Sequence, residues 1–164
     1  MTRRIFLGGT CGNNNWREPF TETLVSQGVP RDIIFNPVVK DWNEEAQKRE
    51  EEEKAKALAH FYYVGDPKVP GLGVGVYSLV ELTMALYDHP DETVVVIDLS
   101  DLRGINPHSL KSLMQTERVL RVRFPQAAIF TTLDSGALFL SQMVKGVFEC
   151  LKSSGDSSGT TPAP

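Results

Sequence analysis

Five short apolar segments alternate with longer segments of helical pattern along this 164-residue chain. The expected strands are residues 4–8, 32–36, 59–64, 93–99 and 127–131, and the expected helices are residues 17–27, 43–58, 77–88, 107–123 and 135–152. The run at 93–99 is the clearest strand, because it is rich in β-branched residues and bounded by polar ones. This alternation predicts an α/β fold, a doubly wound five-stranded parallel sheet of flavodoxin-like or Rossmann-like order 2-1-3-4-5.

Residues 1–152 are expected to form a single domain. A chain of this length suits one hydrophobic core, and 41% hydrophobic with 23% charged residues is typical of a globular protein. Residues 153–164 contain no apolar residue larger than alanine, so we expect a disordered C-terminal tail there.

Charge and composition argue against several classes of partner. The net charge is −4 without a basic cluster, which disfavours a nucleic acid polymer. No apolar run reaches the roughly 20 residues of a membrane helix, and the N-terminus lacks signal-peptide features. Cys11 and Cys150 lie far apart, and free thiols in a reducing cytoplasm are the simplest explanation. The histidines are scattered, so we expect no metal site and no cofactor.

Glu81 is the one charged residue between positions 69 and 87. Burying an unpaired carboxylate is costly, so its presence needs a reason. In one interpretation, Ser78 and Glu81 form a capping box at the start of a helix. In the other, Glu81 is a nucleophile, kept ionised in the first helical turn by the helix dipole. The two interpretations are compatible.

Ligand sites of doubly wound sheets lie at the carboxyl ends of the strands, near the switch in strand order. Gly8, Gly9 and Thr10 lie where the first strand ends, and small residues there let the backbone approach a ligand. A mobile turn is the alternative. The glycine spacing does not match the dinucleotide fingerprint, and no P-loop motif occurs.

Carboxylates also follow the next three strands. Asp41, Asp66 and Asp98 are expected to converge with Glu81 at one rim, although each also fits a turn or cap. Two tryptophans lie in the same loops. Trp16 either stacks on a ligand or covers the edge of the core, and Trp42 either forms a wall of the site or staples the following helix.

The expected helix at 43–58 is strongly charged. Its favourable i,i+4 pairs are Glu44–Lys48, Glu45–Arg49, Glu50–Lys54 and Glu52–Lys56. We interpret this helix as a solvated, self-paired surface in preference to an acidic docking surface. In an oligomer this surface can lie near a neighbour's site.

Several segments resemble the nucleoside 2-deoxyribosyltransferase family, in its divergent deoxyribosyltransferase-like branch. They are Ile5–Thr10 with Trp16-Arg17, Asn36-Pro37 with Asp41-Trp42, the glutamate-rich helix, and Gly75–Leu82. The motifs cover about the first 100 residues. The chain departs from better-known members at Ala59-His60 and at residues 74–77.

The resemblance implies an enzyme that cleaves the N-glycosidic bond of a (deoxy)nucleoside or its monophosphate, with transfer to a base or to water. Glu81 would be the nucleophile and Asp66 the assisting acid. The substrate-binding residues would be Gly8, Gly9, Thr10, Trp16, Asp41, Trp42, Tyr77, Ser78 and Asp98. Members often assemble as dimers or larger, which implies a homo-oligomer. An NAD-cleaving enzyme and a catalytically silent nucleotide-binding module are the alternatives. Arg17, Lys40 and Arg103 are either phosphate contacts or plain surface charges.

Overall fold

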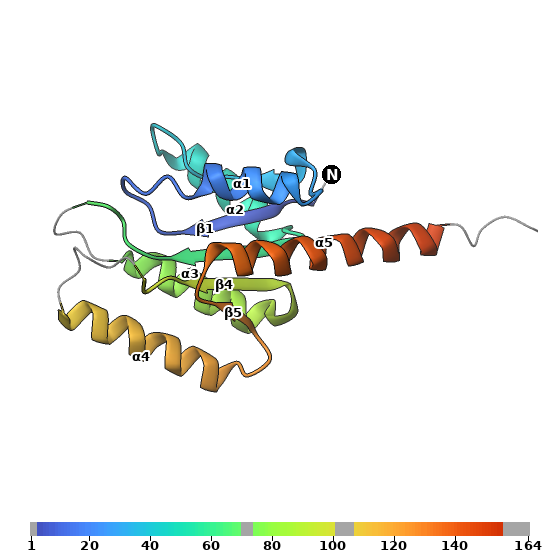
Figure 1. The fold of residues 1–164 in the computed structure, drawn as a ribbon. Coiled ribbons are helices and arrows are strands. Elements are labelled where there is room, and N and C mark those ends of the chain that lie inside the picture. The colour runs from blue at the N-terminus through green and yellow to red at the C-terminus, as the bar shows by residue number, and fades with distance from the viewer. Residues whose placement is uncertain (1–2, 70–73, 101–106, 156–164) are drawn as a thin grey trace, which may run out of the picture.

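Five parallel strands form one sheet between two layers of helices in the computed structural model, which describes residues 3–69, 74–100 and 107–155 (Figure 1). The strands are β1 (Ile5–Gly9), β2 (Ile34–Phe35), β3 (Ala59–Val64), β4 (Thr93–Ile97) and β5 (Ala128–Phe130). The helices are α1 (Arg17–Ser26), α2 (Glu44–Ala55), α3 (Val76–Asp88), α4 (Pro107–Arg123) and α5 (Leu133–Gly155), with 3₁₀ turns η1 (Arg31–Ile33) and η2 (Pro90–Glu92). The strand order is β2-β1-β3-β4-β5, so the predicted topology is confirmed.

Each face of the sheet has its own apolar core. On one face, α1 and α5 pack against alternate residues of the central strands, including Leu7, Phe61 and Val96. On the other face, α3 and α4 pack against the intervening residues, including Phe6 and Tyr62. Strands covered on both sides are apolar throughout, which is why β4 was recognisable from its sequence.

Several boundaries differ from those expected. The second strand is reduced to Ile34–Phe35, because Arg31–Ile33 form a 3₁₀ turn after Pro30. Helix α2 is capped by Asn43, whose side chain accepts from the Ala46 amide, so of the alternatives for Asp41 the cap does not form. Helix α5 continues through Gly155, three residues beyond the expected end of the domain. The rest of the expected tail and Arg103 lie outside the described residues.

Helix α2 is anchored to the sheet by a buried carboxylate. Glu53 is 5% exposed and accepts from Arg4 Nε at 2.9 Å, while Lys56 Nζ lies 2.9 Å from its other oxygen. Burial raises the pKa of Glu53, but the two cations outweigh it and hold the pKa below its usual range. Of the predicted pairs, Glu50–Lys54 forms at 3.2 Å, whereas Lys56 pairs with Glu53 instead of Glu52. One side of α2 therefore faces the protein.

His60 is a buried histidine on β3. Its ring stacks on His89 with centroids 5.0 Å apart, and its Nδ1 atom is buried without a hydrogen-bond partner. Burial, followed by the charges of His89 and Lys54, lowers the pKa of His60 to about 4. The folded protein therefore disfavours the protonated ring.

Because the pKa of His60 is lowered in the folded protein, we expect the fold to lose stability in acid. Between the unfolded pKa of 6.5 and the folded pKa of about 4, the unfolded chain binds the extra proton, so stability falls as the pH falls. We expect His60 to remove about 2 kcal/mol of unfolding free energy between pH 7 and pH 5. Urea unfolding at both pH values measures this loss, which should shrink in His60→Phe and persist in His108→Gln. An equal loss in wild type and His60→Phe would contradict the assignment.

Within the described residues, no helix is long and apolar enough to span a membrane. Those same residues contain no group of three or more His, Cys, Asp or Glu side chains arranged to hold a metal ion.

Candidate active site

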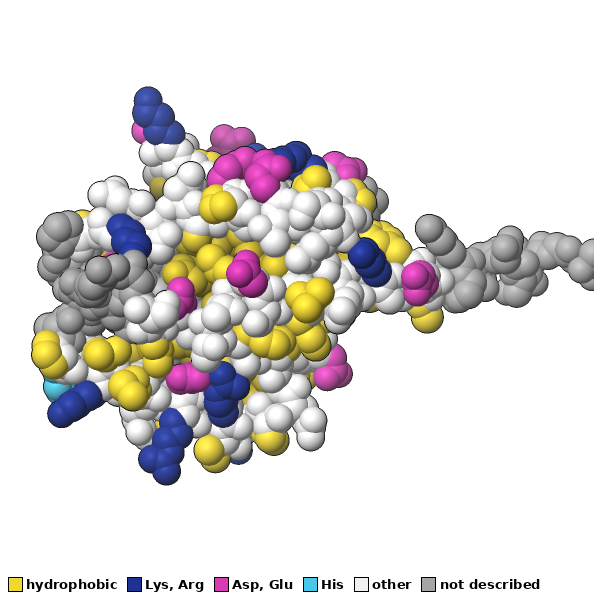
Figure 2. All heavy atoms as spheres, viewed as in Figure 1, with side chains coloured by type: hydrophobic (Ala, Val, Ile, Leu, Met, Phe, Trp, Pro, Cys, Tyr) yellow, Lys and Arg dark blue, Asp and Glu magenta, His cyan; other side chains and the backbone are white. Residues whose placement is uncertain are grey.

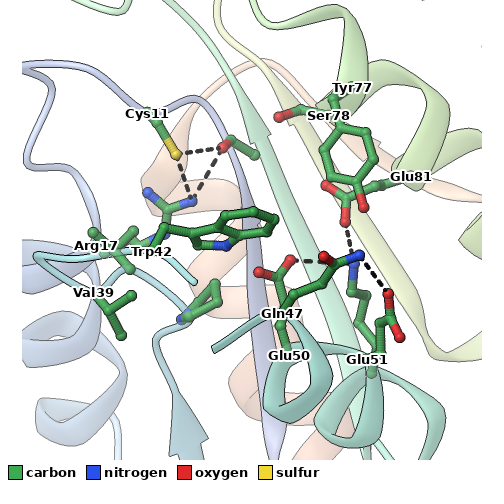
Figure 3. Close-up of a pocket in the computed structure, with 15 residues that line it drawn as sticks. Cys11, Arg17, Val39, Trp42, Gln47, Glu50, Glu51, Tyr77, Ser78 and Glu81 are labelled. Carbon is green, nitrogen blue, oxygen red and sulfur yellow. Dashed lines mark hydrogen bonds and ion pairs between the residues drawn. The ribbon is translucent and has the colours of Figure 1, made fainter. Parts of the chain in front are cut away.

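A cavity of about 360 Å³ lies at the carboxyl end of β1, between α2 and the start of α3 (Figure 3). The end of β1 and the first residue of α1 contribute Gly8, Gly9, Cys11 and Arg17. The loop before α2 contributes Pro37, Val38, Val39 and Trp42; α2 contributes Gln47, Glu50, Glu51 and Lys54; and α3 contributes Tyr77, Ser78 and Glu81. The volume falls within the range of small-molecule sites.

Glu81 reaches this cavity from the second turn of α3. The helix begins at Val76 with Gly75 as its N-cap, and no side chain caps it, so the predicted capping box does not form. Ser78 is already the third helical residue, which places Glu81 too far along the helix to reach the cap. Instead, the Glu81 carboxylate, with its side chain 11% exposed, forms an ion pair with Lys54 of α2.

Lys54 lies between two carboxylates. Its ammonium pairs with Glu81 and lies 3.2 Å from Glu50, and it is also 5.3 Å from the Phe6 ring centroid. Burial raises the pKa of Glu81, and the Lys54 charge offsets only part of that rise. Burial lowers the pKa of Lys54, but Glu81 and Glu50 together outweigh it and leave the pKa above its usual value. The ammonium is therefore firmly charged, whereas the carboxyl group is the easier of the two to neutralise.

Arg17 lines the cavity and binds the carboxyl end of β1. Its guanidinium is buried and donates to the backbone carbonyls of Leu7, Gly9 and Thr10, each at 3.1 Å. Burial lowers the pKa of Arg17, although Cys11 beside it acts in the opposite direction. With its donors directed at carbonyls, Arg17 fixes the glycine loop.

Thr10 and Trp16 also brace this loop. Thr10 is buried, and its hydroxyl oxygen accepts from the Gly65 amide at 3.0 Å. Trp16 is 2% exposed, packs against Phe20 and Tyr63, and donates from its indole nitrogen to the Thr10 carbonyl at 2.9 Å. Of the two interpretations of Trp16, the structure favours the one in which it covers the edge of the core.

Trp42 and Tyr77 are the large aromatic side chains that line the cavity with exposed surface. Trp42 is 62% exposed and Tyr77 is 66% exposed. They belong to different elements, the loop before α2 and the first turn of α3, so they offer two separate apolar surfaces to a ligand (Figure 3).

The other predicted carboxylates are not in this cavity. Asp66 and Asp98 line a neighbouring hollow, while Asp41 is exposed and lines neither. Asp66 and Asp98 each stabilise a local turn. Asp66 Oδ1 accepts from the Lys68 amide at 2.8 Å, and Asp98 Oδ1 accepts from the Ser100 amide at 2.9 Å. The expected convergence on one site is wrong.

The loop that follows β1 separates the two hollows. The Thr10 amide donates to the Tyr63 carbonyl at 2.8 Å, and the Asn13 amide donates to the Pro67 carbonyl at 2.9 Å. Asn14 Nδ2 also donates to the Asp66 carbonyl at 2.6 Å. This loop is bound to the end of β3 and therefore divides the rim that the sequence predicted as continuous.

Most of the polar cavity residues that were not predicted from the sequence come from α2. Gln47, Glu50, Glu51 and Lys54 occupy one side of the helix at i, i+3, i+4 and i+7, and all line the cavity. The spacing was visible in the sequence, but the high charge of the helix favoured a solvent-facing interpretation.

A comparison with protein families gives one match. The family model described as nucleoside 2-deoxyribosyltransferase like matches residues 2–64. The predicted resemblance is confirmed over this stretch, which spans β1 to β3 and supplies the glycine loop, Arg17 and Lys54 to the cavity. Glu81 lies beyond the matched residues. No curated protein and no solved structure matches the chain.

Proposed function

We propose that this protein cleaves the N-glycosidic bond of a (deoxy)nucleoside or its monophosphate, using Glu81 as the nucleophile. The observation that carries the proposal is a largely buried carboxylate in a ligand-sized cavity, in a chain whose first 64 residues include a match to the nucleoside 2-deoxyribosyltransferase-like family. A carboxylate of this kind is suited to attack on a sugar carbon.

The proposed reaction is a double displacement. A Glu81 oxygen forms a bond to the anomeric carbon while the bond from that carbon to the base nitrogen breaks, and the base leaves with the electron pair and takes up a proton. Water, or a nitrogen of a second base, then attacks the anomeric carbon, gives up a proton and releases Glu81 as a carboxylate. We propose that Trp42 and Tyr77 flank the base, and that Gly8, Gly9 and Ser78 contact the sugar.

The proton donor for the leaving base needs a new assignment. Asp66 was the predicted acid, but it lines the neighbouring hollow. Glu50 and Glu51 line the cavity that contains Glu81, and Glu51 is solvent-exposed. We propose that Glu51 protonates the leaving base, because Glu50 is paired with the Lys54 ammonium at 3.2 Å.

We also propose that the chain acts as a homo-oligomer in the cytoplasm. Large apolar side chains of α3 are exposed along one stripe, namely Val76, Val80, Met84 and Tyr87, and such stripes commonly mark interfaces. Within the described residues neither Cys11 nor Cys150 forms a disulfide, which supports a reducing compartment. Sedimentation velocity of the full chain tests the oligomer, which a single monomeric species would contradict.

A substrate panel tests the proposed chemistry. Wild-type protein is incubated with deoxynucleosides, ribonucleosides, their 5′-monophosphates and NAD, with and without a second free base, and the products are separated by chromatography. We expect free base from at least one nucleoside or monophosphate, and a new nucleoside in the presence of the acceptor base if transfer occurs. Base release from NAD alone would favour the NAD-cleaving alternative. Saturable binding without turnover would favour the silent module, and either result overturns the proposal.

A further inference from the structure

Two consecutive residues of α2 face different parts of the protein. Glu53 pairs with Arg4 at the start of β1 and with Lys56, which anchors the helix against the sheet. Lys54 faces the cavity and reaches Glu81, 27 residues further along the chain. Because Glu53 anchors this turn of α2, the backbone that carries the neighbouring lysine is also held in place.

The Lys54 ammonium is constrained on several sides. Glu50 lies one turn back on α2 with its oxygen 3.2 Å away, and the rings of Phe6 and Tyr77 lie 5.3 and 5.7 Å from the nitrogen. Its contact with Glu81 is to Oε1. An ammonium on one carboxylate oxygen holds that oxygen in place and leaves the second oxygen available to form a new bond.

Other groups face Glu81 from every element packed around it. Glu50 of α2 and the buried Arg17 of α1 act on it electrostatically, and its own charge acts in turn on Tyr62 of β3. Tyr77 lines the same cavity on α3. Glu50 disfavours the ionised form and Arg17 favours it, while burial has the largest effect and also disfavours it. Lys54 is the cation in direct contact and the main counterweight to burial.

We propose that Lys54 is a positioning residue that keeps Glu81 ionised and oriented toward the cavity, with Glu50 holding the ammonium in place. This role rests on the proposed function, in which the ionised carboxylate attacks the sugar. It follows that base release fails at low pH when Glu81 takes up a proton, and that this failure moves to higher pH when the ammonium is removed.

The test compares three variants with wild type. Lys54→Met removes the charge and keeps the length of the side chain, Lys54→Arg restores a cation, and Lys48→Met removes an exposed lysine of the same helix as a control. Circular dichroism verifies that each variant is folded. The rate of base release is measured from pH 4 to pH 9, and the Glu81 carboxyl carbon is titrated by NMR in protein labelled at glutamate, with Glu81→Gln identifying the resonance.

In Lys54→Met we expect both the acidic limb of the pH–rate profile and the Glu81 titration to move upward by about one pH unit or more, as for loss of an opposite charge in contact. Lys54→Arg should return both toward wild type, and Lys48→Met should leave both unchanged. Unchanged Glu81 titration in Lys54→Met would overturn the proposal. The NMR titration needs no turnover, so a failure of the proposed function and a failure of the Lys54 role give different results.

Discussion

Glu81→Gln should abolish almost all base release while leaving the protein folded. The amide has nearly the shape of the carboxylate but cannot form the glycosyl ester, so we expect the rate to fall by at least about 1,000-fold, as when other enzymes lose their nucleophile. The fold should tolerate the change, because Lys54 keeps its contact with Glu50 at 3.2 Å. Initial rates with the best substrate of the panel, together with thermal unfolding, measure both effects.

The matched control is Glu45→Gln, which makes the same chemical change on an exposed residue of α2 outside the cavity. It should retain the wild-type rate. A substrate with fluorine at the sugar 2′ carbon provides a second readout, because slow turnover should let the covalent sugar–enzyme ester accumulate. Mass spectrometry should then find the sugar on the peptide containing Glu81 in wild type and find none in Glu81→Gln. Base release at the full rate in Glu81→Gln would rule out the mechanism.

The sheet was predictable because its strands are covered on both faces. Residues 94–97 are apolar at every position because they contribute to both cores, and that continuous pattern is visible without any knowledge of the contacts. The short edge strand Ile34–Phe35 does not need a long run of apolar residues, because it contributes only two residues to the sheet. Its neighbours were therefore assigned to a strand when they in fact form a 3₁₀ turn.

The site was less predictable because its contacts join residues far apart in the chain. Glu81 was selected correctly as a cavity residue, but its partner Lys54 comes from a helix whose charges looked locally satisfied. Ser78 and Glu81 fit a capping motif, yet the helix begins two residues before Ser78, so the motif had no cap to form. A local sequence pattern indicates which contacts are possible, and the packing of distant segments determines which of these contacts form.

The division of the rim has a similar cause. Asp66 and Asp98 follow β3 and β4 in the chain, but the loop after β1 is bound to the end of β3 and separates them from the cavity that contains Glu81. This separation depends on the close approach of Gly9 to the backbone of Tyr63. The sequence Gly-Gly-Thr allows such an approach without specifying it.

Gly9→Ala should therefore be among the most damaging single substitutions in the chain. Gly9 has φ +115°, and an added Cβ would lie 2.0 Å from the Tyr63 carbonyl oxygen and 2.7 Å from its amide nitrogen. Backbone cannot yield as a flexible side chain can, so we expect a loss on the order of 3–5 kcal/mol in unfolding free energy. Urea unfolding measures it, or the soluble yield where the variant does not fold.

Gly146→Ala is the control with the opposite expected sign. Gly146 lies on the exposed side of α5 with nothing within 4 Å of an added Cβ, so alanine should stabilise the helix by about 0.5–1 kcal/mol. A wild-type urea midpoint in Gly9→Ala would mean that β1 and β3 do not approach closely at this point. Displacement of the loop would also remove two of the carbonyls that Arg17 binds, those of Gly9 and Thr10. Stability and base release should consequently be lost together in Gly9→Ala, whereas Glu81→Gln should lose base release alone.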